Sequence, residues 1–195
     1  MYYAKLKEAL NQIAPVEECA WNDLEQFLST KTVRKGELLW KAGDICRQLV
    51  FVNKGLIRSF SLIKEKENTH HFYFENSLFY DDYSFISHKK CTKNYEAVET
   101  TDLSIVPRGA LYLLFDKYKS FERIGRLAVE QIHVKLIENY ERINLYTAEE
   151  NYLHLIDAYP EILQRVPLKH IASYLNISAE HLSRIRKAVS KNDGN

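Results

Sequence analysis

The sequence predicts an α+β protein with an N-terminal β-roll or jelly roll, a long helix and a small helical module at the C-terminal end. Two changes of hydrophobic period carry this prediction. Residues 35–107 contain short β-type runs separated by turn signals, and residues from about 121 onward repeat apolar side chains every three or four positions. A chain of 195 residues suits one large domain and a small one. We expect the domains at 1–147 and 148–195.

Several short strands make up the predicted β-roll. "GELLWKAGD" is typical of a strand that enters a turn, and "QLVFVNKGLIRSFSLI" of two strands that pivot at Asn53-Lys54-Gly55. "HHFYF" and "YEAVETTDLSIVP" add further strands, whereas residues 1–30 have a helical pattern. Many short strands with turn signals favour a sandwich, jelly roll or barrel.

The long helix is predicted at about residues 121–146, a stretch without proline and with one glycine. Its length of roughly seven turns would overhang a compact β domain, which favours a dimer seam over packing on its own domain. The apolar stripe expected at this seam consists of Val129, Ile132, Leu136, Tyr140 and Ile143.

The composition fits a globular protein of a reducing compartment. Hydrophobic residues make up 46% and charged residues 27%, and no apolar run approaches bilayer length. Cys19, Cys46 and Cys91 lie far apart without paired spacing, which argues against a disulfide frame, a zinc site or a cysteine-ligated iron–sulfur cluster. The start of the chain is amphipathic and unlike a secretory signal. We expect a cytoplasmic protein with no metal site and no membrane partner.

The terminal stretch "HIASYLNISAEHLSRIRKAVSK" predicts two short helices joined by a tight turn. Asn176 tolerates the left-handed conformation such a turn needs, and Ser178 is a good N-cap for a second helix at about residues 179–190. Residues 165–195 carry a net charge of +4 on a chain of net +1. Helix-turn-helix proteins use this geometry to place the second helix in the DNA major groove. The alternative is a helical hairpin with a solvated basic face.

"IASYLNISAEHLSRIRK" resembles the helix-turn-helix of the Crp/Fnr transcriptional regulators. "KGELLWKAGD" and "LVFVNKGLIRSF" are similar to the opening strands of that family's cyclic-nucleotide-binding β-roll, so the resemblance covers about residues 25–190. It implies a homodimeric, sequence-specific regulator that binds a near-palindromic double-stranded DNA operator, with RNA polymerase as a further partner. The long helix would be the dimerisation helix.

The resemblance assigns roles within the terminal module. Glu180 and Arg184 match base-reading positions, and Ser178 and His181 match positions that contact phosphates. Ala179 stands where some members have another base-reading arginine, so the preferred DNA sequence should differ. The short connection before Leu168 implies a reduced wing. The complete set of predicted DNA-contacting residues is Lys169, Ser178, Ala179, Glu180, His181, Ser183, Arg184 and Lys187.

The effector pocket departs from the family pattern. A bound cyclic nucleotide needs a glycine for close backbone approach, an arginine for the phosphate and a carboxylate for the ribose. Alignment of "FYDDYSFISHKKCTKNYEAVE" puts Tyr80 at the glycine, Asp81 at the carboxylate and Cys91-Thr92 at the arginine–serine pair. We therefore expect no response to cyclic AMP, no cofactor, and an effector that the sequence leaves open. The candidate pocket residues are Phe79, Tyr80, Asp81, Asp82, Thr92 and Lys93.

A second hypothesis is a cupin-like β-roll enzyme that binds a metal or small molecule and has a structural helical tail. His70 and His71 suggest it, but neighbouring strand residues face opposite sides of a sheet. The sequence also lacks an H-x-H spacing, a nucleophile and an acid–base pair, so we expect no catalytic residues and no enzyme activity.

Overall fold

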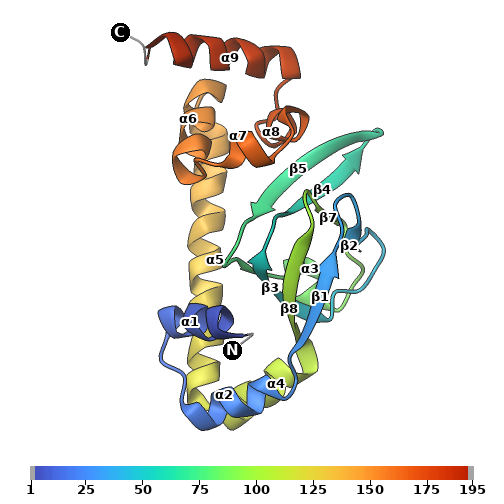
Figure 1. Cartoon of the computed structure of the whole chain (residues 1–195), viewed down its shortest axis with the longest axis vertical. Helices are drawn as coiled ribbons and strands as arrows, with labels where there is room; N and C mark the ends of the chain where they lie inside the picture. Colours follow the sequence, from blue (N-terminus) through green and yellow to red (C-terminus); the bar gives the residue numbers. More distant parts are fainter. Residues whose placement is uncertain (1–2, 193–195) are drawn as a thin grey trace. The chain divides into compact units, whose positions relative to one another are not determined.

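The computed structural model describes residues 3–192, and the order of its elements can be followed in Figure 1. No helix in this range is long and apolar enough to cross a membrane. The helices are α1 (Ala4–Ile13), α2 (Glu18–Glu25), α3 (Asp82–Ser87), α4 (Arg108–Lys117), α5 (Lys119–Leu145), α6 (Ala148–Ala158), α7 (Ile162–Arg165), α8 (Leu168–Tyr174) and α9 (Ala179–Asn192). The strands are β1 (Ser29–Val33), β2 (Leu38–Trp40), β3 (Gln48–Lys54), β4 (Ile57–Ile63), β5 (Lys66–Tyr73), β6 (Leu78–Phe79), β7 (Asn94–Ala97) and β8 (Thr101–Pro107).

The strands form two four-stranded sheets, one in the order β1-β8-β3-β6 and the other in the order β2-β7-β4-β5. In the first sheet β8 runs antiparallel to both of its neighbours, with Ser29 opposite Ile105 and Val50 opposite the same residue. The pivot between β3 and β4 needs glycine, because Gly55 has φ of 99° and a Cβ there would come within 2.6 Å of Thr101 Oγ1. The α+β class and the jelly-roll architecture predicted from the sequence are thus confirmed.

The chain divides into two compact units. The first contains residues 1–59 and 72–134, and the second contains residues 60–71 and 135–195. The outer part of the β4–β5 hairpin therefore belongs to the same unit as the C-terminal helices, although both strands continue by sequence into the first unit.

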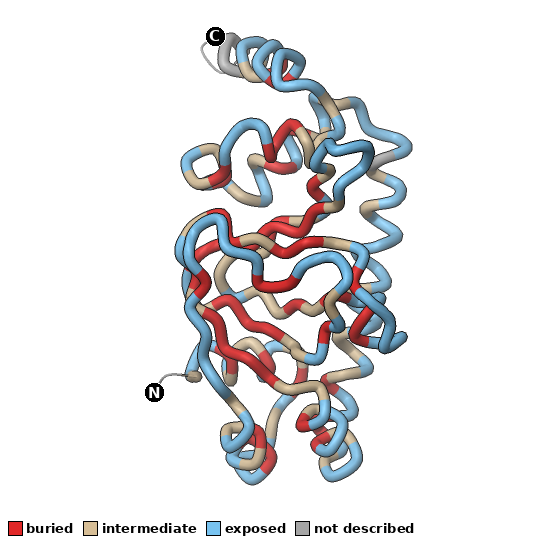
Figure 2. The backbone as a smooth tube through the Cα atoms, turned by 90° about the vertical axis from the view of Figure 1, so that its right-hand side faces the viewer, coloured by how far each residue is buried: buried red, intermediate tan, exposed pale blue. Residues whose placement is uncertain are grey.

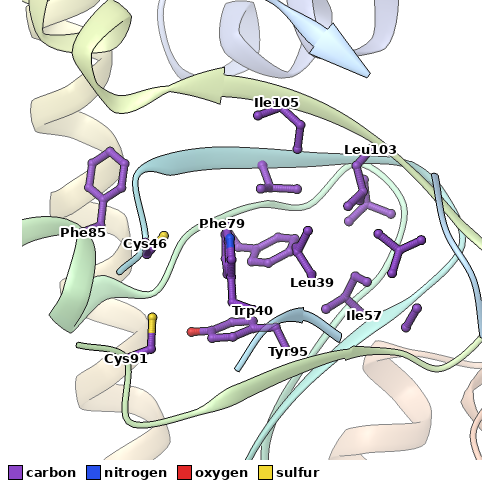
Figure 3. Packing of buried hydrophobic residues seen from close by; sticks show 14 residues of the cluster. Leu39, Trp40, Cys46, Ile57, Phe79, Phe85, Cys91, Tyr95, Leu103 and Ile105 are labelled. Atoms are coloured by element: carbon purple, nitrogen blue, oxygen red, sulfur yellow. The ribbon is translucent and has the colours of Figure 1, made fainter. Parts of the chain in front are cut away.

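Two hydrophobic clusters hold the first unit together. One lies inside the β-roll, where strand residues such as Val50, Leu103 and Tyr95 are almost completely buried (Figure 3). The other joins α1, α2 and α4 to the start of α5 through residues that include Trp21 and Phe121. Helix α4 and strand β1 were not among the elements expected from the sequence.

Helix α5 extends over 27 residues, from Lys119 to Leu145, close to the predicted range of 121–146. The packing of α5 on α4 requires its only glycine, Gly125, because a Cβ there would lie 2.8 Å from the ring of Phe115 on α4. The next helix, α6, begins with a capping box in which Thr147 and Glu150 bind each other's backbone amides. This cap separates α6 sharply from α5.

Candidate nucleic-acid interface and effector pocket

Helices α8 and α9 form the predicted two-helix module. Helix α8 starts at Leu168, directly after Pro167, which lacks the amide that a helix start leaves unpaired. Between the helices Asn176 has φ of 56°, the left-handed conformation expected of this turn. Ser178 Oγ accepts a hydrogen bond of 3.1 Å from the His181 amide, so the predicted N-cap is confirmed.

The apolar sides of α8 and α9 are buried. Ile171 and Ala172 on α8 and Leu182 and Ile185 on α9 are each at most 6% exposed. The two helices pack on each other, and the Ile177 amide closes the turn by donating to the Ala172 carbonyl oxygen at 3.0 Å. The described residues after 134 hold only helices, which agrees with a reduced wing.

The predicted DNA-contacting side chains lie on the open side of this pair. All eight residues are exposed. Figure 2 shows the terminal helix mostly in the pale blue of exposed residues. Glu180 and Arg184 are one turn apart on α9. Hydrogen bonds from the Glu180 backbone amide and the Ser178 hydroxyl lower the pKa of the Glu180 carboxyl, and the charge of Arg184 adds a smaller lowering. An ionised carboxylate accepts hydrogen bonds and an arginine donates them, so the pair offers both halves of a base-reading code.

The apolar stripe of α5 is unusually accessible for its composition. Val129, Leu136 and Tyr140 are 51%, 57% and 72% exposed, and Ile132 is half-buried. The side chain of Ile143 lies outside the described part of the structure. Val134 and Ile137 are also exposed, at 53% and 47%, so the open apolar surface is wider than the predicted stripe. Large exposed apolar patches mark interaction surfaces.

In the candidate effector pocket, both carboxylate oxygens of Asp81 accept hydrogen bonds from other groups of the protein. It is 1% exposed and is the N-cap of α3, with Oδ1 accepting from the Ser84 amide at 2.8 Å. Its other oxygen, Oδ2, accepts from the Tyr95 hydroxyl at 3.0 Å. A carboxylate engaged in this way cannot hold a ribose hydroxyl without giving up a buried partner.

Aromatic side chains pack across the interior of the roll next to Asp81. The rings of Tyr73 and Phe79 stack with centroids 4.1 Å apart, and Tyr95 lies 6.0 Å from Phe79. Trp40 meets Tyr95 edge to face at 5.1 Å, an arrangement visible around the labelled Trp40 and Phe79 in Figure 3. Burial raises the pKa of the Tyr95 hydroxyl, so this group stays protonated and donates to Asp81. The interior is thus occupied by protein.

The remaining pocket residues do not complete a phosphate cradle. Tyr80 packs against Phe85 with ring centroids 4.5 Å apart, and burial raises its pKa to about 12. Asp82 and Thr92 are exposed, and Lys93 is half-buried. Cys91 is buried, and desolvation raises the pKa of its thiol, which keeps it neutral. The set brings together two carboxylates and several rings rather than an anion site.

Sequence reasoning missed two polar contacts because their partners are far apart in the chain. Arg58 is 1% exposed on β4 and forms an ion pair of 2.5 Å with Glu96. In the other unit, the Ser173 hydroxyl of α8 bonds the backbone of Glu67 and Thr69 on β5. The sequence around a strand arginine or a helix serine does not indicate which distant residue it will contact.

The described residues contain no group of three histidine, cysteine or acidic side chains that could hold a metal ion. His70 is exposed, and its Nε2 lies 2.8 Å from the Ser61 hydroxyl within the same hairpin. The structure therefore does not favour the cupin-like alternative.

Comparisons with known proteins agree with this architecture. Residues 30–118 match the family model named "Cyclic nucleotide-binding domain". No curated protein matches the chain in sequence. Among solved structures, FixK2 from Bradyrhizobium japonicum is similar with a TM-score of 0.72 and 15% identity, over 85% of this chain and 86% of that one.

Two further structures extend the likeness. A protein from Eubacterium rectale that is assigned to the Crp/Fnr family has a TM-score of 0.69 and 17% identity, over 91% of this chain and 85% of its own. The regulator CLP from Xanthomonas campestris has a TM-score of 0.70 and 12% identity, over 91% and 93%. The resemblance noted in the sequence is thus confirmed: residues 30–118 match the model of the cyclic nucleotide-binding domain, and the fold is similar to that of Crp/Fnr-type regulators.

Proposed function

We propose that this protein is a homodimeric transcription regulator that binds a near-palindromic DNA operator through α9. The observation that carries the proposal is the two-sided character of the α8–α9 pair. On its apolar side Ile171, Ala172, Leu182 and Ile185 are each at most 6% exposed, while all eight predicted DNA-contacting residues are exposed. Polar side chains on the first turns of a second helix are the groups that helix-turn-helix proteins present to base edges.

Each predicted residue has a role in this proposal. Glu180 and Arg184 read bases, because a carboxylate accepts from the cytosine amino group and arginine bonds guanine bidentately. Ala179 and Ser183 lie against the base edges, and Ala179 suits a contact with a thymine methyl group. The phosphate contacts, which position the helix without reading sequence, come from Lys169, Ser178, His181 and Lys187.

Two copies are needed to place two recognition helices roughly 34–36 Å apart on successive major grooves. The exposed apolar side chains of α5 support dimerisation along this helix, with Val129, Leu136 and Tyr140 at its centre. Burial of such side chains against a second copy removes exposed apolar surface from water, which favours association.

We further propose that the regulator does not respond to cyclic AMP. The stacked rings of Tyr73, Phe79 and Tyr95 and the internal bonds of Asp81 support this, since a nucleotide would have to displace them. The fold admits other effectors, because CLP from Xanthomonas campestris is described as responsive to c-di-GMP. Any effector of this chain would act by shifting the balance between two conformations.

The proposal includes an effector domain at 1–147, a DNA-binding domain at 148–195, a cytoplasmic location and RNA polymerase as a partner at the promoter. A regulator of this kind needs no catalytic residues. The favourable charge of the terminal module fits nucleic acid, since residues 165–195 are net +4.

Selection of bound sites from random DNA tests the proposal directly. We expect the purified protein to enrich a two-fold symmetric motif with half-sites about one helical turn apart. Affinity for that motif should fall steeply with salt, because lysine and arginine contacts release counterions from the DNA. If no motif were enriched, with or without cell metabolite extract, the regulator function would be abandoned.

A further inference from the structure

Strand β5 is an edge strand, and a side chain of the DNA-binding module occupies its open edge. Among the described strands, β5 ends the sheet β2-β7-β4-β5 and pairs with β4 alone. At this edge the Thr69 amide donates to Ser173 Oγ at 2.9 Å, and the Ser173 hydroxyl donates to the Glu67 carbonyl oxygen at 2.7 Å. One hydroxyl thus satisfies a donor and an acceptor that an additional strand would otherwise pair.

The geometry of the strand explains why one hydroxyl reaches both groups. Residues two apart on a strand point their backbone groups to the same side, so the Glu67 carbonyl and the Thr69 amide both face outward. A serine hydroxyl both donates and accepts. Thr69 is 3% exposed, so its amide depends on the Ser173 hydroxyl more than a solvent-facing amide would, whereas the bond to the Glu67 carbonyl oxygen lies at the surface.

A second contact lies one turn earlier on the same helix. His170 and Ser173 are three positions apart on α8 and therefore share a face. His170 is 8% exposed, and its Nδ1 lies 3.6 Å from Glu67 Oε2. Glu67 therefore contacts α8 through both its backbone and its side chain. The contact thus involves two residues on one face of α8 rather than a single hydrogen bond.

Tyr174, the residue after Ser173 on α8, is held by a contact with α5. Arg142 near the end of α5 donates to the Tyr174 hydroxyl at 3.1 Å and to Asn151 Oδ1 of α6 at 2.7 Å. Consecutive residues of α8 thus bond the β4–β5 hairpin and the α5–α6 junction. Because α9 packs on α8 and its Leu182 and Ile185 are buried, whatever orients α8 also orients α9.

We propose that Ser173 is a positioning residue for DNA recognition, which fixes the α8–α9 pair to the β4–β5 hairpin by bridging Glu67 and Thr69. The inference rests on the proposed DNA-binding function. A palindromic operator demands that two recognition helices keep one spacing, and a helix pair free to pivot must lose that freedom on binding. Ser173 removes the freedom beforehand.

The test uses the full-length protein and the operator recovered by selection. Operator affinity is measured for Ser173→Ala, which removes both hydrogen bonds, and for Ser173→Thr, which keeps a hydroxyl. Ser61→Ala is the matched control, because that hydroxyl lies in the same hairpin and pairs with His70 instead of α8. Each protein is also measured on operators with one base pair added or removed between the half-sites, and on unrelated DNA.

We expect Ser173→Ala to bind the operator about 5-fold more weakly, as for loss of a typical hydrogen bond. It should also discriminate less between correct and altered half-site spacing, and its affinity for unrelated DNA should be unchanged. Ser173→Thr and Ser61→Ala should behave like the parent. Amide exchange should accelerate at Thr69 in Ser173→Ala alone, which reports the hydrogen bond independently of DNA.

The outcomes separate the inference from the function on which it rests. A parent protein that selects no operator overturns both. A parent that binds its operator, with Ser173→Ala matching it in affinity and spacing preference, overturns only the positioning role. Tighter operator binding by Ser173→Ala would also overturn it, because the bridge would then oppose recognition.

Discussion

The C-terminal helix pair and the interior of the β-roll differ in where their polar groups point. On α9, Glu180, Arg184 and Lys187 are exposed and directed away from the buried apolar side. In the roll, Asp81 and the hydroxyl of Tyr95 are buried and bonded to each other at 3.0 Å. Polar groups that reach solvent remain available to another molecule, whereas groups paired inside the protein contribute to its stability. The same fold therefore carries an exposed polar surface, the proposed DNA-reading surface, and a roll interior at the candidate effector pocket whose polar groups are paired within the protein.

The largest expected effect comes from a charge placed in the apolar stripe of α5. Leu136→Glu should convert the dimer into monomers, because an ionised carboxylate at a closed interface loses its hydration without a partner. Operator affinity should then fall roughly 100-fold or more, since the second half-site no longer binds from the same molecule. Light scattering and a DNA-binding titration measure the two effects.

Gln131→Glu is the matched control for this change. Gln131 is exposed on the opposite side of α5 from Leu136 and receives the same charge. A Gln131→Glu protein that also dissociates, or a Leu136→Glu protein that stays dimeric, would show that the stripe is not the seam.

The next largest effect is expected at the recognition helix. Arg184→Ala should cost about 1–3 kcal/mol in operator binding, equivalent to roughly 5- to 150-fold, and relax preference at one base pair per half-site. Lys187→Ala should weaken binding similarly for all sequences and reduce the salt dependence. Titrations against operators with single base changes distinguish the two patterns. Equal specificity in the parent and Arg184→Ala proteins would remove Arg184 from base reading.

A smaller effect, on stability alone, is expected in the pocket. Asp81→Ala removes the N-cap of α3 and leaves the buried Tyr95 hydroxyl without this acceptor, so unfolding free energy should fall by about 1–3 kcal/mol. Asp82→Ala, the exposed neighbour, should change it by no more than about 0.5 kcal/mol. Denaturant titrations measure both. Comparable losses in the two proteins would mean that Asp81 is not part of the closed interior.

The last prediction is that cyclic AMP has no effect on thermal stability. Cyclic AMP at a concentration a hundredfold above a working dissociation constant would stabilise a binding protein by about 2.7 kcal/mol. We expect no shift of the melting temperature with cyclic AMP at millimolar concentration, whereas a cyclic AMP-binding regulator measured alongside should shift. A clear shift in this protein would mean that the stacked rings yield to a nucleotide.

The sequence alone determined the features that depend on neighbours along the chain. The Asn176 turn, the Ser178 cap, the start of α8 at Leu168 and the length of α5 follow from backbone preferences and a period of three and four residues. These interactions span a few residues, so the residue types suffice to predict them. The outward set on α9 followed in the same way, since one helical period places it opposite Leu182 and Ile185.

Only the tertiary structure decided the features that join distant segments. The stacking of Tyr73, Phe79 and Tyr95 fills the roll, and Asp81 becomes a buried cap rather than a ligand. Ser173 meets Glu67 across 106 positions of sequence, an encounter that no local pattern encodes. Such contacts depend on which strand lies at the sheet edge and which helix covers it, and that is settled by the packing of the whole chain.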